Sequence, residues 1–403
     1  MRLPVLFHRF LLVAALTGMP ALAAAAQAAN GAPQSAPAAT EASRPIVVRD
    51  VAGREVTLKA PAQRVVLAQA RHLPVLALLH PDPASILVGW SDELKTSFAN
   101  EYADYVAAFP SLADVAVVGR HTPDTFSVES ALGQRPDLVI LTAAFAGIRP
   151  GTHPSESPLI RRLEAAGVPV VVIDFFMDPL ENTVPSLRLL GQALGREEQA
   201  EAFIDFYQER MNRVAARNAE ADGPPPLVFV HAHAGTTDCC HSPGVGTFND
   251  MIRYAGGHNI GADVIRSATG QLGFEYINSR NPKVYVATGT GASQRTSSGL
   301  AIGSNATPEA AEASLARVIE SQGLGALEAV RTGNAHGIWH AFNDSPLHVV
   351  FIEALARWID PERHADVSPE ATLAEINRRF LPVPLRGTYM VDLSAPLTRA
   401  DQP

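Results

Sequence analysis

The 403-residue chain is poor in cysteine, with only two residues, Cys239 and Cys240, that stand side by side. So few cysteines exclude a fold held by a disulfide framework or a cysteine-rich zinc cluster. Beyond the first residues, no apolar run reaches the roughly 20 residues that a membrane-spanning helix needs. Positive charge is also scarce, because 32 Lys and Arg against 41 Asp and Glu give a net charge of −9. Nucleic acids and anionic membranes are therefore disfavoured as the main partners.

The first residues are typical of a secretory signal. Arg2 and Arg9 supply positive charge before an apolar stretch at 10–16, and small-residue cleavage sites follow. An uncleaved membrane anchor is the alternative, but the apolar stretch is short and rich in small residues. We predict a cleaved signal peptide over 1–26 and a periplasmic protein, with no cysteine near the cleavage region for lipid attachment. Residues 27–44, rich in Ala, Pro, Ser and Gln, are expected to form a flexible lead-in.

Two α/β blocks follow, separated by a helical one. After a hairpin expected over 47–58, short runs of Val, Ile and Leu alternate with helix-length spacers, as in domains with a parallel sheet buried on both faces. The expected strands lie at 64–68, 86–89, 115–119, 138–141 and 170–173 in the first block, and at 227–231, 284–287 and 338–341 in the second. The pattern predicts an α/β fold of two lobes with mainly parallel sheets.

The middle block has no strand signal and carries one helical stripe. Its apolar residues Phe203, Ile204, Tyr207, Met211 and Val214 share one face of a helix. A long helix between two sheets is a stiff connector. We therefore predict an N-terminal lobe at 45–178, a connecting helical segment at 179–222, a C-terminal lobe at 223–384 and a C-terminal tail at 385–403. Since ligands collect beyond the carboxyl ends of parallel strands, a ligand cleft is expected between the lobes.

Short motifs spread over roughly 46–382 occur in a characteristic order. They are Asp50-Val51-Ala52-Gly53-Arg54, Pro61-Ala62-Gln63-Arg64-Val65-Val66, Ser127-Val128-Glu129, Arg135-Pro136-Asp137-Leu138-Val139-Ile140, Leu189-Leu190-Gly191-Gln192-Ala193-Leu194-Gly195-Arg196-Glu197, Gly246-Thr247-Phe248, Ala255-Gly256-Gly257-His258-Asn259 and Phe274-Glu275-Tyr276-Ile277-Asn278. In these motifs the chain resembles the periplasmic binding proteins for iron–siderophore and cobalamin uptake, the rigid-hinge class with a single spanning helix. The resemblance implies a binding protein and not an enzyme, whose two lobes close only slightly on a ligand.

The resemblance also implies partners. Such a protein is the capture component of an ABC importer and hands its ligand to an inner-membrane permease with its ATPase. Glu129 and Glu275 match the positions where the family places one exposed carboxylate per lobe for docking to permease arginines. The alternative is that both are solvated acids near helix N-termini, where acids are favoured anyway. We expect a monomer with no cofactor and no bound nucleic acid.

Residues just after the predicted strands are the candidates for the ligand cleft. An arginine fork suits the carboxylate or catecholate oxygens of ferric chelates, and aromatic rings can form apolar walls; loop side chains facing water are the alternative. The candidates in the first lobe are Gln69, Arg71, His72, Arg120, Phe145 and Phe176, the last with equal weight for core and cleft. Those in the second lobe are His233, Trp339, His340 and Asn343, and we expect Trp339 to lie nearer the ligand than His340 because neighbours on a strand point to opposite faces.

The segment from His231 to His241 departs from the family pattern. His231 and His233 are two apart at a strand end and share a face, so they could bind a metal together with a thiolate. In an oxidising compartment, a disulfide between the adjacent Cys239 and Cys240 is favoured, although free thiols stay open. As a disulfide, the pair would stiffen the loop, and no resident metal is assigned.

The predicted ligand is a ferric siderophore or a similar iron chelate. The same fold could instead bind cobalamin or haem, for which an axial histidine is available at His72, His233 or His340. A third hypothesis is direct binding of a transition metal through His231, His233 and His241. An enzyme with a cysteine nucleophile is disfavoured, because no nucleophile elbow, phosphate loop or pair of catalytic carboxylates is found, and no catalytic residue is predicted.

Overall fold

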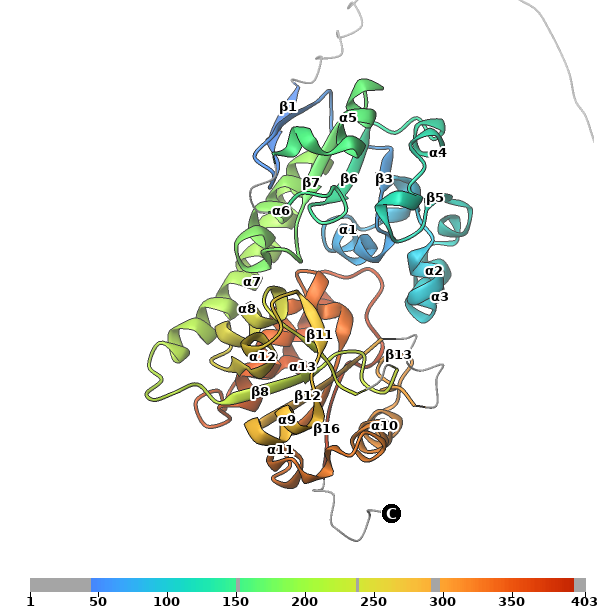
Figure 1. Ribbon diagram of the computed structural model, residues 1–403. Coiled ribbons are helices and arrows are strands. Elements are labelled where there is room, and N and C mark those ends of the chain that lie inside the picture. The colour runs from blue at the N-terminus through green and yellow to red at the C-terminus, as the bar shows by residue number, and fades with distance from the viewer. Residues whose placement is uncertain (1–44, 150–152, 237–238, 291–297, 395–403) are drawn as a thin grey trace, which may run out of the picture. The chain divides into compact units, whose positions relative to one another are not determined.

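The computed structural model describes residues 45–149, 153–236, 239–290 and 298–394 (Figure 1). The predicted signal peptide and lead-in therefore lie outside the described residues. Within the described part of the chain, no helix is long and apolar enough to cross a membrane.

The first lobe is built on a parallel five-stranded sheet. Its strands are β3 (Val65–Leu67), β4 (Leu87–Ser91), β5 (Ala116–Gly119), β6 (Leu138–Thr142) and β7 (Val170–Ile173), in the order β5-β4-β3-β6-β7. All five strands lie where the runs of Val, Ile and Leu predict them, and β3, β6 and β7 are wholly buried. The strand order reverses between β3 and β6, so the crevice favoured by ligands in such sheets lies at the carboxyl ends of these two strands.

Helices and a hairpin complete the first lobe. The hairpin pairs β1 (Ile46–Arg49) with β2 (Glu55–Leu58), as expected. The helices are α1 (Leu73–Leu79), α2 (Glu93–Ser97), α3 (Ala99–Ala108), α4 (Val128–Gly133) and α5 (Pro158–Ala165), with short 3₁₀ turns η1 (Ala70–His72), η2 (Pro83–Ser85), η3 (Pro110–Asp114), η4 (Pro123–Thr125) and η5 (Pro154–Glu156).

Two helices form the connector. They are α6 (Pro179–Leu194) and α7 (Glu197–Asn218), separated by Gly195 in the left-handed conformation at φ 63°. The predicted apolar stripe of α7 is buried from Phe203 to Val214. Figure 1 shows α6 and α7 running from the first sheet toward the second. The fold is therefore the predicted pair of α/β lobes joined by a long helical connector.

The second lobe contains a mixed five-stranded sheet. Its strands are β8 (Leu227–His231), β10 (His258–Asn259), β12 (Val284–Gly289), β14 (Ala335–Trp339) and β16 (Met390–Asp392), in the order β10-β8-β12-β14-β16, and β16 is antiparallel to β14. Here the order reverses between β8 and β12. Two small sheets pair β9 (His241–Pro243) with β11 (Thr269–Gln271) and β13 (Gly303–Ser304) with β15 (Gly387–Thr388).

Two predictions for this lobe need correction. The strand expected at 338–341 occupies Ala335–Trp339, and residues from His340 onward form the 3₁₀ turn η9 (His340–Asp344). The tail expected from residue 385 contains β15 and β16, so the lobe extends past residue 384. Both differences arise from long-range pairing, since β16 pairs with β14 although more than 50 residues separate them in the chain.

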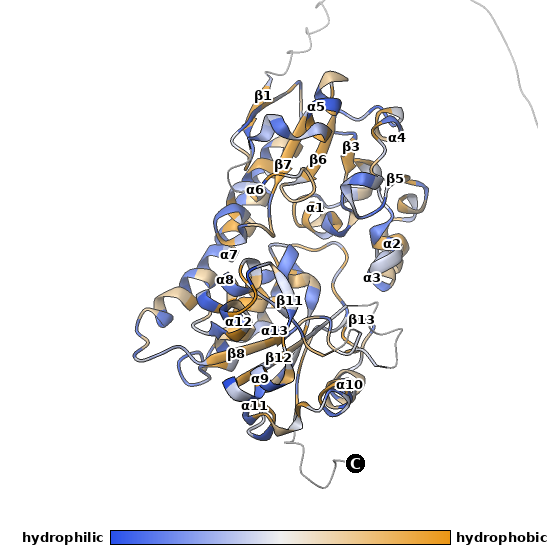
Figure 2. Cartoon of the chain, viewed as in Figure 1, coloured by the Kyte–Doolittle hydropathy of each residue, from blue (hydrophilic) through white to orange (hydrophobic). Residues whose placement is uncertain are grey.

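Helices cover the second sheet. They are α8 (Thr247–Tyr254), α9 (Phe274–Arg280), α10 (Pro308–Ser321), α11 (Glu328–Arg331), α12 (His348–Ile359) and α13 (Pro369–Arg379), with 3₁₀ turns η6 (Ile260–Asp263) and η8 (Leu324–Ala326). Ser368 caps α13, because its Oγ accepts a hydrogen bond from Ala371 N at 3.2 Å. Figure 2 shows apolar strands such as β7 and β8 beside helices of mixed character, as expected for sheets buried on both faces.

Candidate functional site

Two polar side chains lie at the carboxyl ends of β3 and β6, where the strand order of the first sheet reverses. Gln69 follows β3 and Thr142 ends β6, and Thr142 Oγ1 donates to Gln69 Oε1 at 2.5 Å. Both residues are buried. The predicted candidate Gln69 thus lies in the crevice that the strand order creates, held there by Thr142, which the sequence analysis did not single out.

Two histidines lie near the carboxyl end of β12, where the strand order of the second sheet reverses. Thr288, near the end of β12, accepts from the backbone N of His233 at 3.1 Å and pairs with His340 Nδ1 at 2.8 Å. The His233 and His340 rings have centroids 3.9 Å apart. Burial is the main cause that lowers the pKa of both imidazoles, with a further contribution from His241 to His233 and from His233 to His340. Both rings are therefore held in the neutral form, in which a ring nitrogen is free to accept or to ligate.

An ionic cluster joins the two lobes. Arg71, in η1 of the first lobe, lies between two carboxylates: its Nη1 is 2.9 Å from Asp344 Oδ2, and its Nε is 3.2 Å from Glu93 Oε1. His72 Nε2 lies 3.4 Å from the other oxygen of Asp344. Asp344 ends η9 of the second lobe, so this cluster, defined as Arg71, His72, Glu93 and Asp344, spans both lobes.

The protonation of the two carboxylates differs. Burial acts to raise the pKa of Asp344, but Arg71 and His72 more than offset it, so the pKa lies below its ordinary value. Burial raises the pKa of Glu93 despite the opposing effect of Arg71. Asp344 is therefore the firmer partner of the guanidinium. About a third of the Arg71 side chain remains exposed, at 31%, which leaves the charged group reachable from solvent.

A cavity lies next to the ionic cluster. It has a volume of about 30 Å³ and is lined from both lobes by Arg71, Pro74, Leu94, Phe98, Glu101, Tyr105, Trp339, Ala341, Asp344, Ser345, Leu347 and Leu385. Glu101 Oε2, Tyr105 Oη and Trp339 Nε1 are buried in its lining and have no hydrogen-bond partner among the described residues. Burial raises the pKa of Glu101. Buried polar atoms without a partner cost free energy, so each of these three atoms can gain a hydrogen bond from a ligand that reaches it.

The other candidates of the first lobe lie differently. Arg120 is exposed beyond β5, the edge strand of its sheet. Phe145 is 3% exposed and packs edge-on against Phe126 at 6.0 Å, which places it in the core rather than in a cleft wall. Phe176 is half-buried, and its carbonyl oxygen accepts from Thr247 of the second lobe. Phe145 was therefore misplaced by its position after a strand, because the next turn folds back onto the sheet.

The candidates around Trp339 divide between two places. Trp339 lines the cavity and packs edge-on against Phe98 of the first lobe at 6.3 Å, whereas His340 contacts Thr288 and His233. Asn343 is 4% exposed. Trp339 is 5% exposed and belongs to the hydrophobic core, whereas the strand ends before His340, which begins η9 and contacts residues of the second lobe.

Four ionisable residues of the ionic cluster and the cavity escaped sequence reasoning. Glu93, Glu101 and Tyr105 come from α2 and α3, and Asp344 ends η9. Asp344 directly follows the predicted candidate Asn343, and a carboxylate partner for the predicted Arg71 could have been sought there. Glu101 and Tyr105 are four apart on one helical face, which is also the spacing of ordinary surface residues, so the sequence offers no distinguishing signal for them.

Glu129 and Glu275 occupy similar local positions. Each lies in the first turn of a short helix, α4 or α9, and both are exposed. Glu129 is paired with Arg162 at 3.2 Å on the surface. No ion pair is found for Glu275 within the described ranges, and the neighbouring Phe274 is 43% exposed.

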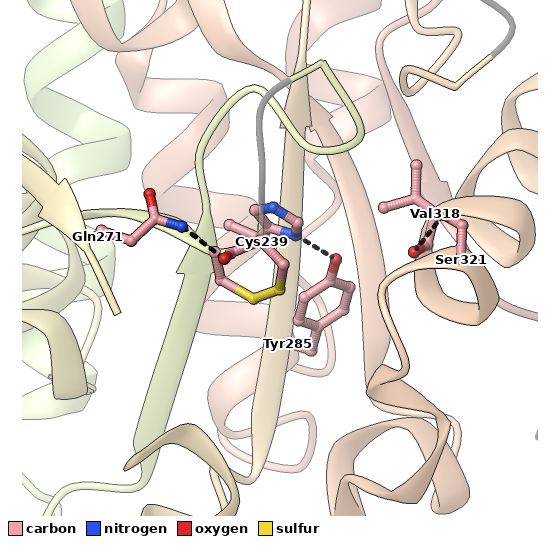
Figure 3. The surroundings of a disulfide bond; sticks show 7 residues. Cys239, Gln271, Tyr285, Val318 and Ser321 are labelled. Carbon is pink, nitrogen blue, oxygen red and sulfur yellow. Dashed lines mark hydrogen bonds between the residues drawn. A yellow bond between two sulfur atoms is a disulfide. The ribbon is translucent and has the colours of Figure 1, made fainter. Parts of the chain in front are cut away.

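The two cysteines form a disulfide in the second lobe (Figure 3). His231, at the end of β8, is fully buried beside them, with Nδ1 3.1 Å from the hydroxyl of Tyr285. Burial lowers the pKa of His231 to about 4. In the described residues, one set of three metal-ligating side chains lies close together, namely His231, Cys239 and Cys240. The predicted trio of His231, His233 and His241 is not such a set, because His233 packs on His340 instead.

Comparison with known proteins gives one family and several relatives. The family described as periplasmic binding protein matches residues 76–336. Two cobalamin-binding proteins from strains of Halobacterium salinarum are 28% identical over 261 residues, which is 64% of this chain and 62% of each relative. The chain thus aligns with less than two thirds of the length of these relatives.

Two solved structures show how far the likeness extends in space. The TroA-like periplasmic binding protein FepB from Veillonella parvula superposes with a TM-score of 0.80 and 28% identity, covering 87% of this chain and 100% of that one. CeuE of Helicobacter pylori with bound Ni(II) gives a TM-score of 0.58 at 17% identity, covering 83% and 95%. The second likeness shows the fold alone.

Proposed function

Since the chain belongs to the periplasmic binding protein family, we propose that it captures a ferric siderophore or a similar iron chelate and delivers it to an ABC importer. The family and its structural neighbours are solute-binding proteins, so the activity is binding and not catalysis. The small molecule they hold is a transported substrate rather than a cofactor.

The ionic cluster is the observation that supports this cargo. Arg71 of one lobe is neutralised by Asp344 of the other. A chelate that brings carboxylate or catecholate oxygens into the space between the lobes can replace Asp344 as the partner of the guanidinium fork. The neutral pair His233 and His340 faces the same region from the second sheet and can accept hydrogen bonds from the chelate.

The size of the cavity sets a condition on binding. Pockets for small molecules usually measure about 300–1,000 Å³, whereas the space beside Arg71 is about 30 Å³. A chelate can therefore enter only when the contacts between Arg71 and Asp344 and between Phe98 and Trp339 separate. The proposal thus requires a modest opening of the lobes, with the ion pair exchanged for contacts to the guest.

Intrinsic fluorescence tests the proposal directly. The chain has three tryptophans, of which Trp339 lines the cavity, while Trp358 stacks on His336 at 4.3 Å in the second lobe. Titration with ferric hydroxamate, catecholate and carboxylate chelates should quench the fluorescence with at least one of them. Trp339→Phe should remove most of the quenching and Trp358→Phe should retain it. Absence of quenching with every chelate would rule out this cargo.

Cobalamin is the second candidate, favoured by the two relatives named as cobalamin-binding proteins. Haem is a third, because His233 and His340 are neutral and offer a ring nitrogen as axial ligand. Absorption spectroscopy separates the three cargoes. A cobalamin or haem spectrum that shifts on mixing with the protein, and fails to shift with His340→Gln, would favour these ligands over a ferric chelate.

The surface carboxylates support docking to an inner-membrane permease. Glu129 and Glu275 each project from the first helical turn in separate lobes, and two spaced negative charges can orient the protein on a basic partner. Glu129→Lys with Glu275→Lys should abolish uptake in cells that carry the permease and its ATPase, without changing chelate affinity. Glu309→Lys is the matched control, because Glu309 is an exposed acid in the first turn of α10.

Export to the periplasm is part of the same proposal. Arg2, Arg9 and the apolar stretch that lies between them and the alanine-rich cleavage sites support a signal peptide over 1–26. Intact mass measurement of the protein recovered from the periplasm should show a soluble monomer that begins near residue 27. A mass that retains the first 26 residues would contradict cleavage.

A further inference from the structure

His231, Cys239 and Cys240 lie in a buried part of the second lobe, apart from the ionic cluster. A ring nitrogen of His231 and both sulfur atoms lie within 4.8 Å of one another. Cys240 and His231 are fully buried and Cys239 is half-buried. Figure 3 shows the disulfide of Cys239 close to the side chain of Tyr285.

His231 has one ring nitrogen to spare. Its Nδ1 lies 3.1 Å from the Tyr285 hydroxyl, which fixes the ring orientation, while Nε2 is buried and has no hydrogen-bond partner among the described residues. An imidazole held at one nitrogen by a hydrogen bond and open at the other is the arrangement of a metal-ligating histidine. A buried polar atom without a hydrogen-bond partner costs free energy. The unpaired Nε2 therefore points to a ligand independently of the close approach of the three side chains.

The backbone holds the two cysteines in place independently of their sulfurs. The carbonyl oxygen of Cys239 accepts from Gln271 Nε2, and that of Cys240 accepts from Leu272 N at 3.0 Å. His241 O, the next carbonyl along, accepts from Ala232 N at 2.8 Å and ties the segment to the end of β8. Opening the disulfide therefore leaves both sulfurs near His231.

We propose that His231, Cys239 and Cys240 form a redox-gated site for a soft monovalent cation, Cu(I), which is closed in the disulfide form and opens when a dithiol reduces the pair. The dithiol supplies two electrons and two protons, so that the S–S bond breaks, two thiols form and the dithiol itself closes to a cyclic disulfide. Cu(I) then displaces the thiol protons and is bound by two sulfurs and one nitrogen.

The donor set selects the ion. Thiolates favour soft cations such as Cu(I). Three ligands complete the coordination of Cu(I), whereas protein-bound zinc is almost always four-coordinate. The site lies outside the ionic cluster and does not depend on the chelate proposal. It makes the second lobe responsive to the redox state of its surroundings, because the same two sulfurs either bind each other or hold a metal.

The test compares one protein in two redox states. The purified chain is reduced with dithiothreitol, desalted without oxygen and titrated with Cu(I) against a chromophoric Cu(I) chelator, beside the untreated disulfide form. Reduced protein should take up one Cu(I) per chain and the oxidised protein none. A disulfide that the dithiol cannot open in the folded protein, or a reduced protein that takes up no Cu(I), overturns the proposal.

Variants identify the ligands. Cys239→Ser with Cys240→Ser should abolish uptake, and His231→Gln should weaken it by about 100-fold or more in the reduced state. His153→Gln, which changes an exposed histidine just before η5 in the first lobe, should leave uptake unchanged. Equal binding by the double serine variant would also overturn the proposal. If His231→Gln fails to fold by circular dichroism, the comparison of oxidised and reduced wild-type protein still decides the outcome.

Discussion

Arg71 of the first lobe and Asp344 of the second form an ion pair of 2.9 Å across the space where a ligand is proposed to bind. The two residues should affect ligand binding in opposite ways. Arg71 offers the positive charge that an anionic chelate needs, whereas Asp344 already pairs with that charge. The pair therefore links the two lobes, and a ligand that binds Arg71 must replace Asp344.

Removing the two members of this pair should have opposite effects on affinity. Arg71→Gln should weaken binding of a carboxylate-bearing ferric chelate by roughly 10- to 100-fold, the worth of a charge-assisted hydrogen bond. Asp344→Asn should tighten it, because the guanidinium no longer has to leave a carboxylate. Fluorescence titration measures both, with Arg161→Gln, a surface arginine bonded to Ser155 O, as control. Equal losses in both variants would show that the pair is only structural.

The stability of the protein should fall as the pH is lowered from 6.5. Burial lowers the pKa of His348 to about 3, whereas an unfolded histidine titrates near 6.5. Below pH 6.5 the unfolded chain binds a proton at His348 that the folded chain does not bind. The contribution of His348 to the free energy of unfolding is therefore complete above that pH and is lost as the pH falls toward 3. Each such histidine contributes a slope of about 1.4 kcal/mol per pH unit.

Urea unfolding between pH 7 and pH 5 measures this slope. His348→Gln should reduce the slope of the free energy of unfolding against pH by the contribution of one proton. The variant also loses the hydrogen bond between His348 Nε2 and the Tyr207 hydroxyl at 2.7 Å. Tyr207→Phe is the matched control, because it removes the same bond and keeps the imidazole. It should lower stability at pH 7 and retain the wild-type slope; a flattened slope in this variant would contradict the assignment to His348.

The strands and the connector were predictable because their signals are local. Five runs of Val, Ile and Leu mark the first sheet, and the stripe from Phe203 to Val214 marks α7. The partners of Arg71 were not predictable, since Glu93 meets it only through the packing of the first lobe and Asp344 only through the contact between the lobes. Likewise β16 is three residues long and becomes a strand only by pairing with β14. Local sequence patterns thus give the elements, and long-range packing decides the site.

The close approach of α6 and α7 should depend on Gly191. A methyl group at this position would lie 2.6 Å from the Cβ of Ala200 on α7 and 3.2 Å from Arg196 O, which is closer than packing allows. Gly191→Ala should therefore lower the free energy of unfolding by about 1–3 kcal/mol through overpacking. Gly133→Ala is the control at the end of α4, where nothing lies within 4 Å, and it should stabilise by about 0.4–1 kcal/mol. Urea denaturation of both variants measures the contrast, and equal effects would contradict it.

The hydroxyl of Tyr105 should lower the free energy of unfolding and raise the affinity for the chelate. It is buried beside the cavity without a hydrogen-bond partner in the described part of the chain. Tyr105→Phe removes an unsatisfied polar group and should raise the free energy of unfolding by about 1 kcal/mol, while it weakens chelate binding because the guest loses a donor. Tyr254→Phe is the matched control, because the Tyr254 hydroxyl donates to Met211 O at 3.0 Å. It should lose about 1 kcal/mol of stability and keep its affinity. Urea unfolding and fluorescence titration measure the two quantities, and a Tyr105→Phe variant that is less stable with unchanged affinity would show that the hydroxyl serves the fold and not the ligand.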